Sequence, residues 1–172
     1  MSLQYTSVLA PSSRLREYAE KLNMQVRNYM TKDVFTVRAD RKLLIAEEVM
    51  SWAKCRHVPV VDAENRVVGL ITHRDLLRAS LSCLEKCKGS IEQREHLSKI
   101  EIEDAMATDV AVIDPEASIC AAARLMRKGK YGCLPVVDSR NVLLGILTEI
   151  DLIAILEHID LEATPAAREP VH

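Results

Sequence analysis

Two threonine–aspartate pairs are the residues of this chain best suited to chemistry. Thr72 and Asp75, and again Thr148 and Asp151, stand three residues apart, directly after an apolar run that is typical of a strand. On a helix that begins at the threonine, this spacing brings a hydroxyl and a carboxylate together in the first turn. Such a carboxylate can accept two hydrogen bonds from vicinal sugar hydroxyls, or the pair can simply cap the helix. Spacing alone favours the cap.

Basic residues surround the first of these pairs. They are Lys54, Arg56 and His57, just before an apolar run, and His73 and Arg74, beside the threonine. Phosphate groups need hydrogen-bond donors and positive charge, which these side chains supply. The alternative is a solvated basic turn that binds nothing. We expect Arg56 and His57 to be the best phosphate candidates.

The pairs recur because the chain carries one structural unit twice. Residues 57–75 read HVPVVDAENRVVGLITHRD and residues 133–151 read CLPVVDSRNVLLGILTEID, without a gap. The offset is the same at every matched position, for example 148 − 72 = 76 residues. A period this long, present only twice, argues against a solenoid. We expect two similar halves packed face to face about a pseudo-twofold axis, with related clefts between them.

Each copy is predicted to fold as strand, helix, strand, strand, helix. The fold class is therefore α+β, two β-α-β-β-α repeats with an N-terminal helix and a helical insert. Periodicity and turn residues place the elements. The expected strands are residues 34–37, 58–62 and 67–71 in the first copy and 110–113, 134–138 and 142–147 in the second, with helices over 43–53 and from Ser118, and further helices opening at Thr72 and Thr148.

The segments outside the repeats divide the chain further. The predicted boundaries are an N-terminal extension at 1–25, the first repeat at 26–81, a helical linker at 82–101, the second repeat at 102–161 and a disordered tail at 162–172. An apolar stripe over residues 12–29 predicts a helix that packs on the domain. Gly89 can end one helix, and residues 90–93 have the spacing of a capping box that starts another, giving an exposed bridge.

Composition excludes several classes of protein. The 172 residues are 48% hydrophobic with a net charge of −2, so neither nucleic acid nor a membrane is expected as the main partner. No apolar stretch reaches the ~20 residues of a membrane span, and no signal peptide is seen, which indicates a cytoplasmic protein. Five irregularly placed cysteines suggest reduced thiols. Cys83 and Cys87 lack partners for a metal site, and nothing orients Cys55 or Cys133 as a nucleophile, so we expect no metal and no catalysis.

The repeated motifs carry a family resemblance. The pattern V-P-V-V-D (L-P-V-V-D in the second copy) followed by G-h-h-T-x-x-D, where h is a hydrophobic residue, resembles tandem cystathionine β-synthase (CBS) domains, the pair called a Bateman module. Lead-ins like the family's typical D-h-M-T precede both copies, at residues 28–31 and 104–107. The resemblance implies a regulatory module that binds AMP, ADP, ATP or S-adenosylmethionine between the repeats and forms disk-shaped homodimers.

The resemblance also implies roles for individual residues. Asp75 and Asp151 would hold the ribose with Thr72 and Thr148. Residues before the h-P strand would face phosphates or base, which in the second copy includes Cys133 at the position of His57. Backbone groups and apolar walls would hold adenine, at Thr36, Val37, Val58, Leu70, Val112, Ile113, Leu134 and Ile146. Each of these side chains is equally suited to the core of a strand.

The two clefts are expected to differ. Where the first copy has Lys54, Arg56, His57, His73 and Arg74, the second has Lys130, Gly132, Cys133, Glu149 and Ile150. Glu149 disfavours a second phosphate-filled cleft and suits S-adenosylmethionine better. Two functions stay open: a nucleotide sensor that signals to an unknown regulated protein, or a constitutive dimerisation module with empty clefts. The last helix is apolar over more than one face, which predicts a homodimer.

Overall fold

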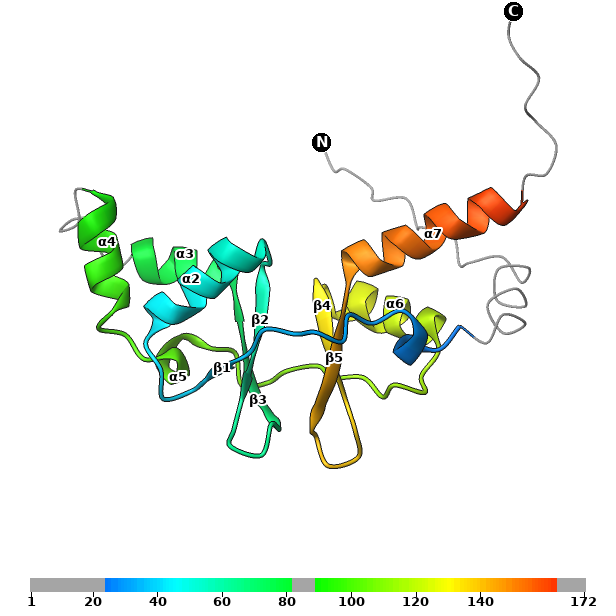
Figure 1. The fold of residues 1–172 in the computed structure, drawn as a ribbon, viewed down its shortest axis with the longest axis horizontal. Helices are drawn as coiled ribbons and strands as arrows, with labels where there is room; N and C mark the ends of the chain where they lie inside the picture. The colour runs from blue at the N-terminus through cyan, green and yellow to red at the C-terminus, as the bar shows by residue number, and fades with distance from the viewer. Residues whose placement is uncertain (1–23, 82–88, 164–172) are drawn as a thin grey trace, which may run out of the picture.

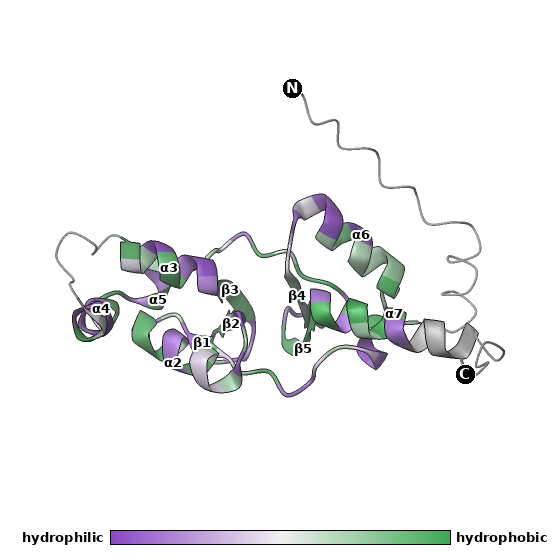
Figure 2. Ribbon diagram, turned by 90° about the horizontal axis from the view of Figure 1, so that it is seen from above, coloured by the Kyte–Doolittle hydropathy of each residue, from purple (hydrophilic) through white to green (hydrophobic). Residues whose placement is uncertain are grey.

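Two small α/β halves face each other across the centre of the protein. The computed structural model describes residues 24–81 and 89–163. In Figure 1 the strands of both halves lie at the centre, and Figure 2 shows the helices on the outer sides. The first half contains β1 (Val37–Arg38), α2 (Leu43–Ala53), β2 (His57–Val61), β3 (Val67–Thr72) and α3 (His73–Leu81); the second contains α6 (Ile119–Gly129), β4 (Cys133–Val137), β5 (Leu143–Thr148) and α7 (Glu149–Ala163). The predicted α+β class is confirmed.

The hairpins are the part of each repeat that the sequence predicts best. β2 pairs with β3 and β4 with β5 in antiparallel register, each within one residue of the expected bounds. Both hairpins turn at an asparagine with positive φ, 60° at Asn65 and 65° at Asn141. Asparagine tolerates this left-handed conformation better than most residues do. Both hairpins also carry an irregularity at the same place, between Val60 and Val61 and between Val136 and Val137.

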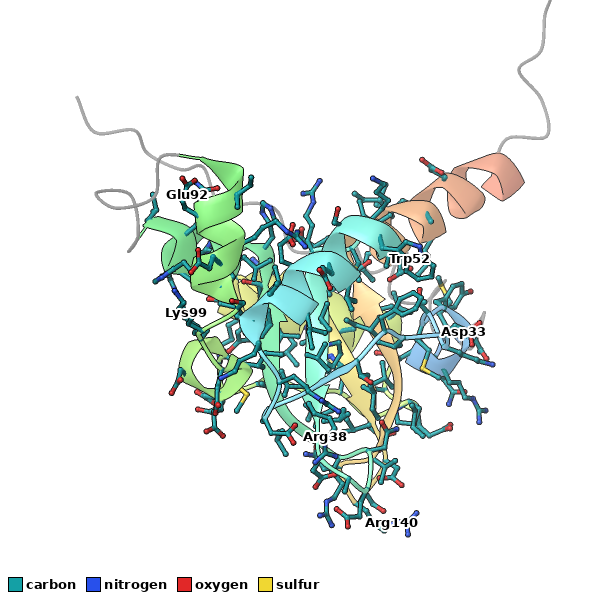
Figure 3. All side chains as sticks on the ribbon, turned by 60° about the vertical axis from the view of Figure 1, so that its left-hand side comes forward. Asp33, Arg38, Trp52, Glu92, Lys99 and Arg140 are labelled. Atoms are coloured by element: carbon teal, nitrogen blue, oxygen red, sulfur yellow. The ribbon has the colours of Figure 1, made fainter. Side chains whose placement is uncertain are left out.

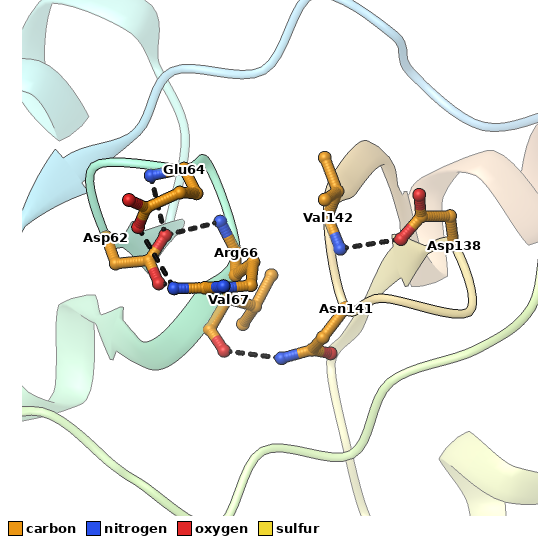
Figure 4. Close-up of polar contacts among 7 residues, drawn as sticks. All are labelled: Asp62, Glu64, Arg66, Val67, Asp138, Asn141 and Val142. Atoms are coloured by element: carbon orange, nitrogen blue, oxygen red, sulfur yellow. Dashed lines mark hydrogen bonds and ion pairs between the residues drawn. The ribbon is translucent and has the colours of Figure 1, made fainter.

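The tips of the two hairpins bond to each other and mark the pseudo-twofold axis (Figure 4). The Asn141 side-chain amide donates to the Val67 carbonyl at 2.7 Å, as Figure 4 shows. The Asn65 side-chain amide makes the equivalent bond to the Leu143 carbonyl at 3.2 Å. Residues Arg66 and Val142, which are equivalent in the two repeats, form a bridge. Beneath them lies a small core shared by both halves, made of Val61, Val67, Val137 and Leu143.

The first strand of each repeat is shorter than predicted. Instead of a strand over residues 34–37, β1 comprises only Val37–Arg38, and in place of the 110–113 strand there is one parallel bridge, Ile113 to Val136. The reason is that residues 31–36 and 107–112 cross between the halves. Thr31 bridges Ile146 of the second half and Ala107 bridges Leu70 of the first. Figure 3 labels Asp33, beside the short helix before it, and Arg38 on β1, at the two ends of one crossing segment.

Because of this crossing, each half is completed by the lead-in of the other repeat. The 3-10 helix η1 (Val26–Asn28) lies beside α6 (Figure 1), and Val26 is fully buried in the core of the second half. The helix α5 (Ile102–Ala105) places Ile102 in the core of the first half. The crossing chain passes so close to β5 that a Cβ on Gly145 would come within 2.7 Å of the Met30 sulfur. The two halves are therefore interlocked.

The segment between the repeats is a docked helix rather than an exposed bridge. The helix α4 (Ser90–Leu97) follows Gly89 as N-cap and has no side-chain cap bond, so the predicted capping box at Ser90 is wrong. Leu97 is buried in the core of the first half. Arg94 donates to Glu47 and Glu48 of α2, both at 2.6 Å. The helix thus belongs to the first half.

Several sequence predictions fall partly or wholly outside the described residues. Of the N-terminal helix expected over residues 12–29, the described part contains only η1, a 3-10 turn and not an α-helix. The helix end expected at Gly89 concerns residues 82–88, which lie outside the described ranges, as do Cys83, Cys87 and residues 164–172 of the expected tail. The helices expected from residue 43 and after Ser118 are confirmed, and Ser118 caps α6 by accepting from the Ala121 amide at 3.1 Å.

Candidate functional site

Both threonine–aspartate pairs cap the helices that follow them. In the first repeat the backbone amide and hydroxyl of Thr72 donate to Asp75 Oδ2 at 2.9 and 2.6 Å. In the second, the same groups of Thr148 donate to Asp151 Oδ2, both at 2.7 Å. One carboxylate oxygen is therefore occupied by the cap in each pair, and the sugar-binding role depends on the other. Asp75 Oδ1 lies 3.5 Å from an Arg78 nitrogen, whereas Asp151 makes no ion pair within the described ranges.

A cavity of about 410 Å³ lies between the two repeats and is here called the inter-repeat cleft. The second repeat contributes Thr148 and the start of α7, and the first contributes its crossing segment and the basic turn, residues 54–57. Its lining residues are Thr31, Asp33, Val34, Phe35, Ala53, Lys54, Cys55, Arg56, His57, Gly132, Ile146, Thr148, Glu149 and Ile150. The basic turn therefore faces the threonine of the other repeat across this cleft, and within its own hairpin His57 also pairs with Thr72.

The walls of the inter-repeat cleft combine apolar surface with balanced charge. Four side chains supply the apolar part: Val34, Phe35, Ile146 and Ile150. Lys54 and Arg56 bring positive charge, and Asp33 and Glu149 bring negative charge. Ligand pockets are typically apolar with a few polar groups that fix orientation. This arrangement suits a ligand with an apolar ring system, hydroxyl groups and little net charge.

His57 lies at the contact between the basic turn and α7. The imidazole packs over Gly132, where a Cβ would be 2.9 Å from Nε2. Burial lowers the pKa of His57 below its ordinary value of 6.5, Glu149 opposes that effect and Arg56 adds to it. The imidazole is therefore neutral at pH 7. In that state His57 offers one hydrogen-bond donor and one acceptor, not the positive charge that phosphate recognition favours.

The two cysteines beside these positions are poor nucleophiles. Cys133, the counterpart of His57, is buried in β4 and lines none of the cavities described here. Burial, aided by Glu149, raises the pKa of the Cys133 thiol to about 12. Burial also raises the pKa of Cys55, which does line the inter-repeat cleft. Since the thiolate is the reactive form, neither side chain is activated for chemistry at neutral pH.

The structure separates the first pair from the inter-repeat cleft. Thr72 lines none of the three cavities described, and Asp75 lines a different one of about 320 Å³ with Arg78, Ala79, Ile100, Asp104 and Ala105. His73 lines a third cavity, beneath α4. Arg74 is exposed on α3 and lines none of the three. The basic residues around Thr72 are thus divided between different surfaces.

The comparison with known proteins decides the family. The sequence profile of the CBS domain matches residues 26–82 and 102–158. The chain belongs to the CBS-domain family. A CBS domain-containing protein of Dictyostelium discoideum is 30% identical over 144 residues, 84% of this chain and 98% of that protein. A Vibrio cholerae protein described as acetoin utilization protein AcuB superposes with a TM-score of 0.68 at 32% identity, covering 86% of this chain and 98% of that one. CBSX2 of Arabidopsis thaliana, solved with AMP, has a TM-score of 0.66 at 26% identity over 80% and 98% of the chains.

Most of the apolar residues expected to hold adenine lie in the cores of the two CBS repeats. Val58 and Leu134 have no exposed surface, and Val37 and Ile113 are buried with them in their respective cores. These four side chains pack in the cores and line none of the three cavities. Thr36, Leu70 and Val112 are half-buried but line none of the three cavities. Of this group only Ile146 lines the inter-repeat cleft.

Some lining residues of the CBS pair escaped the sequence reasoning. Asp33, Val34 and Phe35 come from the crossing segment, and Ile150 from the first turn of α7. Phe35 also makes an edge-on ring contact with Trp52, at 5.1 Å between centroids. The available signal was the position of residues 33–35 directly after the M-T lead-in. Between the CBS repeats this segment forms one wall of the cleft.

The described ranges hold no group of three or more His, Cys, Asp or Glu side chains that is close enough to bind a metal ion. Within residues 24–81 and 89–163, no helix of the CBS pair combines the length and apolarity of a membrane span.

Proposed function

We propose that this protein is a regulatory CBS pair that binds an adenosine-containing ligand in the inter-repeat cleft. One observation carries the proposal: the cleft brings Thr148, bonded to Asp151, opposite an apolar wall and a charged turn from the other repeat. A ribose, a base and a charged tail need those three kinds of surface. The complex of CBSX2 with AMP supports the same ligand class.

In this proposal the sugar lies at the Thr148–Asp151 cap. Thr148 lines the cleft, and Asp151 stands directly behind it, half-buried, with one carboxylate oxygen engaged by the cap. The other oxygen accepts from the vicinal hydroxyls of the ribose, and a charged acceptor strengthens those bonds. The base packs against Val34, Phe35 and Ile146. The cavity volume of about 410 Å³ is within the range that small-molecule sites occupy.

The charges of the cleft order the candidate ligands. Lys54 and Arg56 are offset by Asp33 and Glu149, and His57 is neutral at pH 7. A strongly anionic triphosphate gains little there, because attraction to the two cations is opposed by repulsion from the two carboxylates. S-adenosylmethionine, which carries charges of both signs, and AMP therefore rank ahead of ADP and ATP.

Signalling follows from the two-sided nature of the cleft. The ligand contacts residues 31–35 and 54–57 of the first repeat and residues 146–150 of the second, so its binding stabilises one relative arrangement of the halves. A ligand changes the behaviour of a protein only through different affinities for two states. A regulated partner that binds one arrangement more tightly would then bind to an extent that depends on the ligand concentration.

The test is a thermal unfolding and calorimetric titration with S-adenosylmethionine, AMP and ATP. Ligand at ~100 times its Kd adds about 2.7 kcal/mol to the free energy of unfolding. Asp151→Asn keeps the oxygen that caps the helix but places an amide where the ribose needs an acceptor. The expected loss of affinity is roughly 10- to 150-fold, equal to about 1.5–3 kcal/mol for bonds to a charged group.

Asp75→Asn is the matched control, because it changes an identical cap whose threonine, Thr72, does not line the inter-repeat cleft as Thr148 does. It is expected to leave the affinity within twofold of the native protein. Equal losses in both variants would place the ligand elsewhere. If none of the three compounds alters stability, the protein is instead a constitutive dimerisation module with empty clefts.

We also propose that the exposed apolar side of α7 packs against a second copy of the chain. Ile153 and Leu156 are 51% and 61% exposed, although Leu152 and Ile155 of the same helix pack inward. Exposed apolar clusters of this kind mark contact surfaces. Sedimentation analysis should give a dimer for the native chain and a monomer for Ile153→Lys. A native monomer, or an unchanged dimer in the variant, contradicts this assignment.

A further inference from the structure

The largest of the three cavities lies between α2, α3 and α4 and shares the basic turn with the inter-repeat cleft. It encloses about 550 Å³ and is here called the α4 pocket. Its lining residues are Glu47, Met50, Ser51, Lys54, Cys55, Arg56, His73, Leu76, Leu77, Ser80, Gln93, Arg94 and Leu97. We infer that the α4 pocket binds a small organic anion with an apolar body and a carboxylate or phosphate head. This inference does not rest on the proposed adenosine site, although Lys54, Cys55 and Arg56 line both cavities.

The wall formed by α4 is held in place by ion pairs to α2 and by a buried residue at its end. Arg94 donates one nitrogen to Glu47 and another to Glu48, both at 2.6 Å. Leu97, at the end of the helix, is buried in the core of the first repeat. These contacts fix α4 against α2, and the pocket lies where α2, α3 and α4 meet. The pocket is therefore a built cavity between packed elements.

Positive charge gathers where α2 ends and α3 begins. The His73 amide donates to the Arg56 carbonyl at 2.9 Å, which brings the start of α3 against the basic turn. Lys54, Arg56 and His73 all line the pocket there. Within the described ranges, none of these three forms an ion pair. The carboxylate of Glu47 also lines the pocket, but Arg94 neutralises it. The net effect is an uncompensated basic end.

The rest of the pocket is apolar. Met50, Leu76 and Leu97 are 4–5% exposed and form its floor, and the half-exposed Leu77 stands at its rim. A basic end and an apolar floor in one cavity match a ligand that has an anionic head on a hydrocarbon body. An inorganic anion would leave the floor uncovered, and a neutral hydrocarbon would leave the basic groups without a partner. Both parts of the ligand are therefore required for tight binding.

The second repeat has lost the basic end at its equivalent positions. Gly132 stands for Arg56 and Glu149 stands for His73, while Lys130 keeps the positive charge of Lys54. The anion site is thus specific to the first repeat. Since Lys54 and Arg56 also line the inter-repeat cleft, variants that test the α4 pocket must change other residues.

The experiment is an NMR titration of the ¹⁵N-labelled full chain with hexanoate and hexyl phosphate. Hexanol and inorganic phosphate serve as the two halves of the ligand. Both amphipathic anions are expected to shift the amides of Leu77, Ser80 and Gln93, and to bind at least about tenfold more tightly than either half. The tighter of the two anions identifies the head group. Equal affinity for hexanol and hexanoate overturns the proposal, as do shifts confined to Thr148 and Glu149.

His73→Glu tests the basic end directly. It introduces the residue that the second repeat carries at the same helix position, so the start of α3 accommodates it. The variant should bind hexanoate about tenfold more weakly, because it replaces a ring N–H donor by a negative charge beside the anionic head, and should bind hexanol unchanged. Lys130→Gln, which alters the net charge by the same amount outside the pocket, should bind as the native chain does. Equal weakening in both variants would mean that only overall charge matters, and the site would be withdrawn.

Discussion

The two repeats share a backbone but present different side chains to the space between them. Lys54 and Lys130 both end their helices with φ of 55°, and both hairpins carry the same irregularity and the same asparagine turn. At the helix starts, however, His73 and Arg74 in the first repeat correspond to Glu149 and Ile150 in the second. Of these four residues, His73, Glu149 and Ile150 line a cavity. Duplication preserved what the fold needs and freed the rest to diverge.

The residues that differ between the repeats contact each other across the two halves. The basic turn of the first repeat faces α7 of the second, so His57 meets Glu149 and Gly132. Gly132, which replaces the arginine of the first repeat, leaves the room that the imidazole of His57 occupies. A large side chain at residue 132 would close this contact. The charge and shape of the inter-repeat cleft therefore depend on the turn of one repeat and the helix of the other.

The largest expected effect tests the exchange of core residues between the halves. Ile102 belongs to the lead-in of the second repeat but is fully buried in the first half. Ile102→Ala should lower the free energy of unfolding by about 2–5 kcal/mol, the usual range for an isoleucine removed from a core. Urea unfolding measures it. Ile91→Ala, at a site that is 80% exposed, is the control and should change stability little. Similar losses of unfolding free energy in both variants would contradict the exchange of core residues between the halves.

A second, smaller effect tests the charge difference between the repeats. Glu149→His gives the second repeat the residue of the first and removes one negative charge from the inter-repeat cleft. If the cleft holds an adenosine ligand, ATP should then bind about tenfold more tightly and S-adenosylmethionine more weakly, because a nearby charge is worth roughly 1.4 kcal/mol. Calorimetric titration checks this. Glu103→His on α5, outside the cleft, should change neither affinity, and equal changes in both variants would contradict the assignment.

The smallest effect is a pH dependence that only the first repeat carries, since Cys133 replaces His57 in the second. Burial holds the pKa of His57 below 6.5, so the unfolded chain takes up a proton at a higher pH than the folded protein does. Its contribution to stability is present above pH 6.5 and is lost as the pH falls through the folded pKa. Between pH 7 and pH 5 the Tm of the native chain should therefore fall further than that of His57→Gln. The same decline in both would exclude His57 as the cause.

Local patterns predicted most of the fold. The hairpins, α2, α6 and both threonine–aspartate caps follow from alternation, helical spacing and cap residues within a few positions of each other. The crossing segments could not be predicted, because residues 34–37 show the same apolar pattern whether they pair in a sheet or pass between two. The start of α4 was misplaced by one residue, since glycine and serine both occur at N-caps and Gly89 takes that position.

Local patterns also predicted part of the site. Thr148, Arg56, His57 and Ile146 were named from the sequence, and all four line the inter-repeat cleft. Their meeting across the cleft was not predicted, because spacing along the chain cannot tell which turn faces which helix across a pseudo-twofold axis. Phe35 and Asp33 were missed because their role arises from the crossing. Val58 and Leu134 fit an apolar wall by type, but the same property places them in the core.

The exchange of lead-in segments also limits how the protein can be divided. Residues 24–30 fill the half that they do not belong to, and residues 100–106 do the same in return. A fragment holding either CBS repeat alone would lack part of its own interior and keep an orphaned apolar strip. A protease cut in the connection between them should yield two pieces that remain bound. In this protein the smallest part of the chain with a complete core is therefore the pair of repeats.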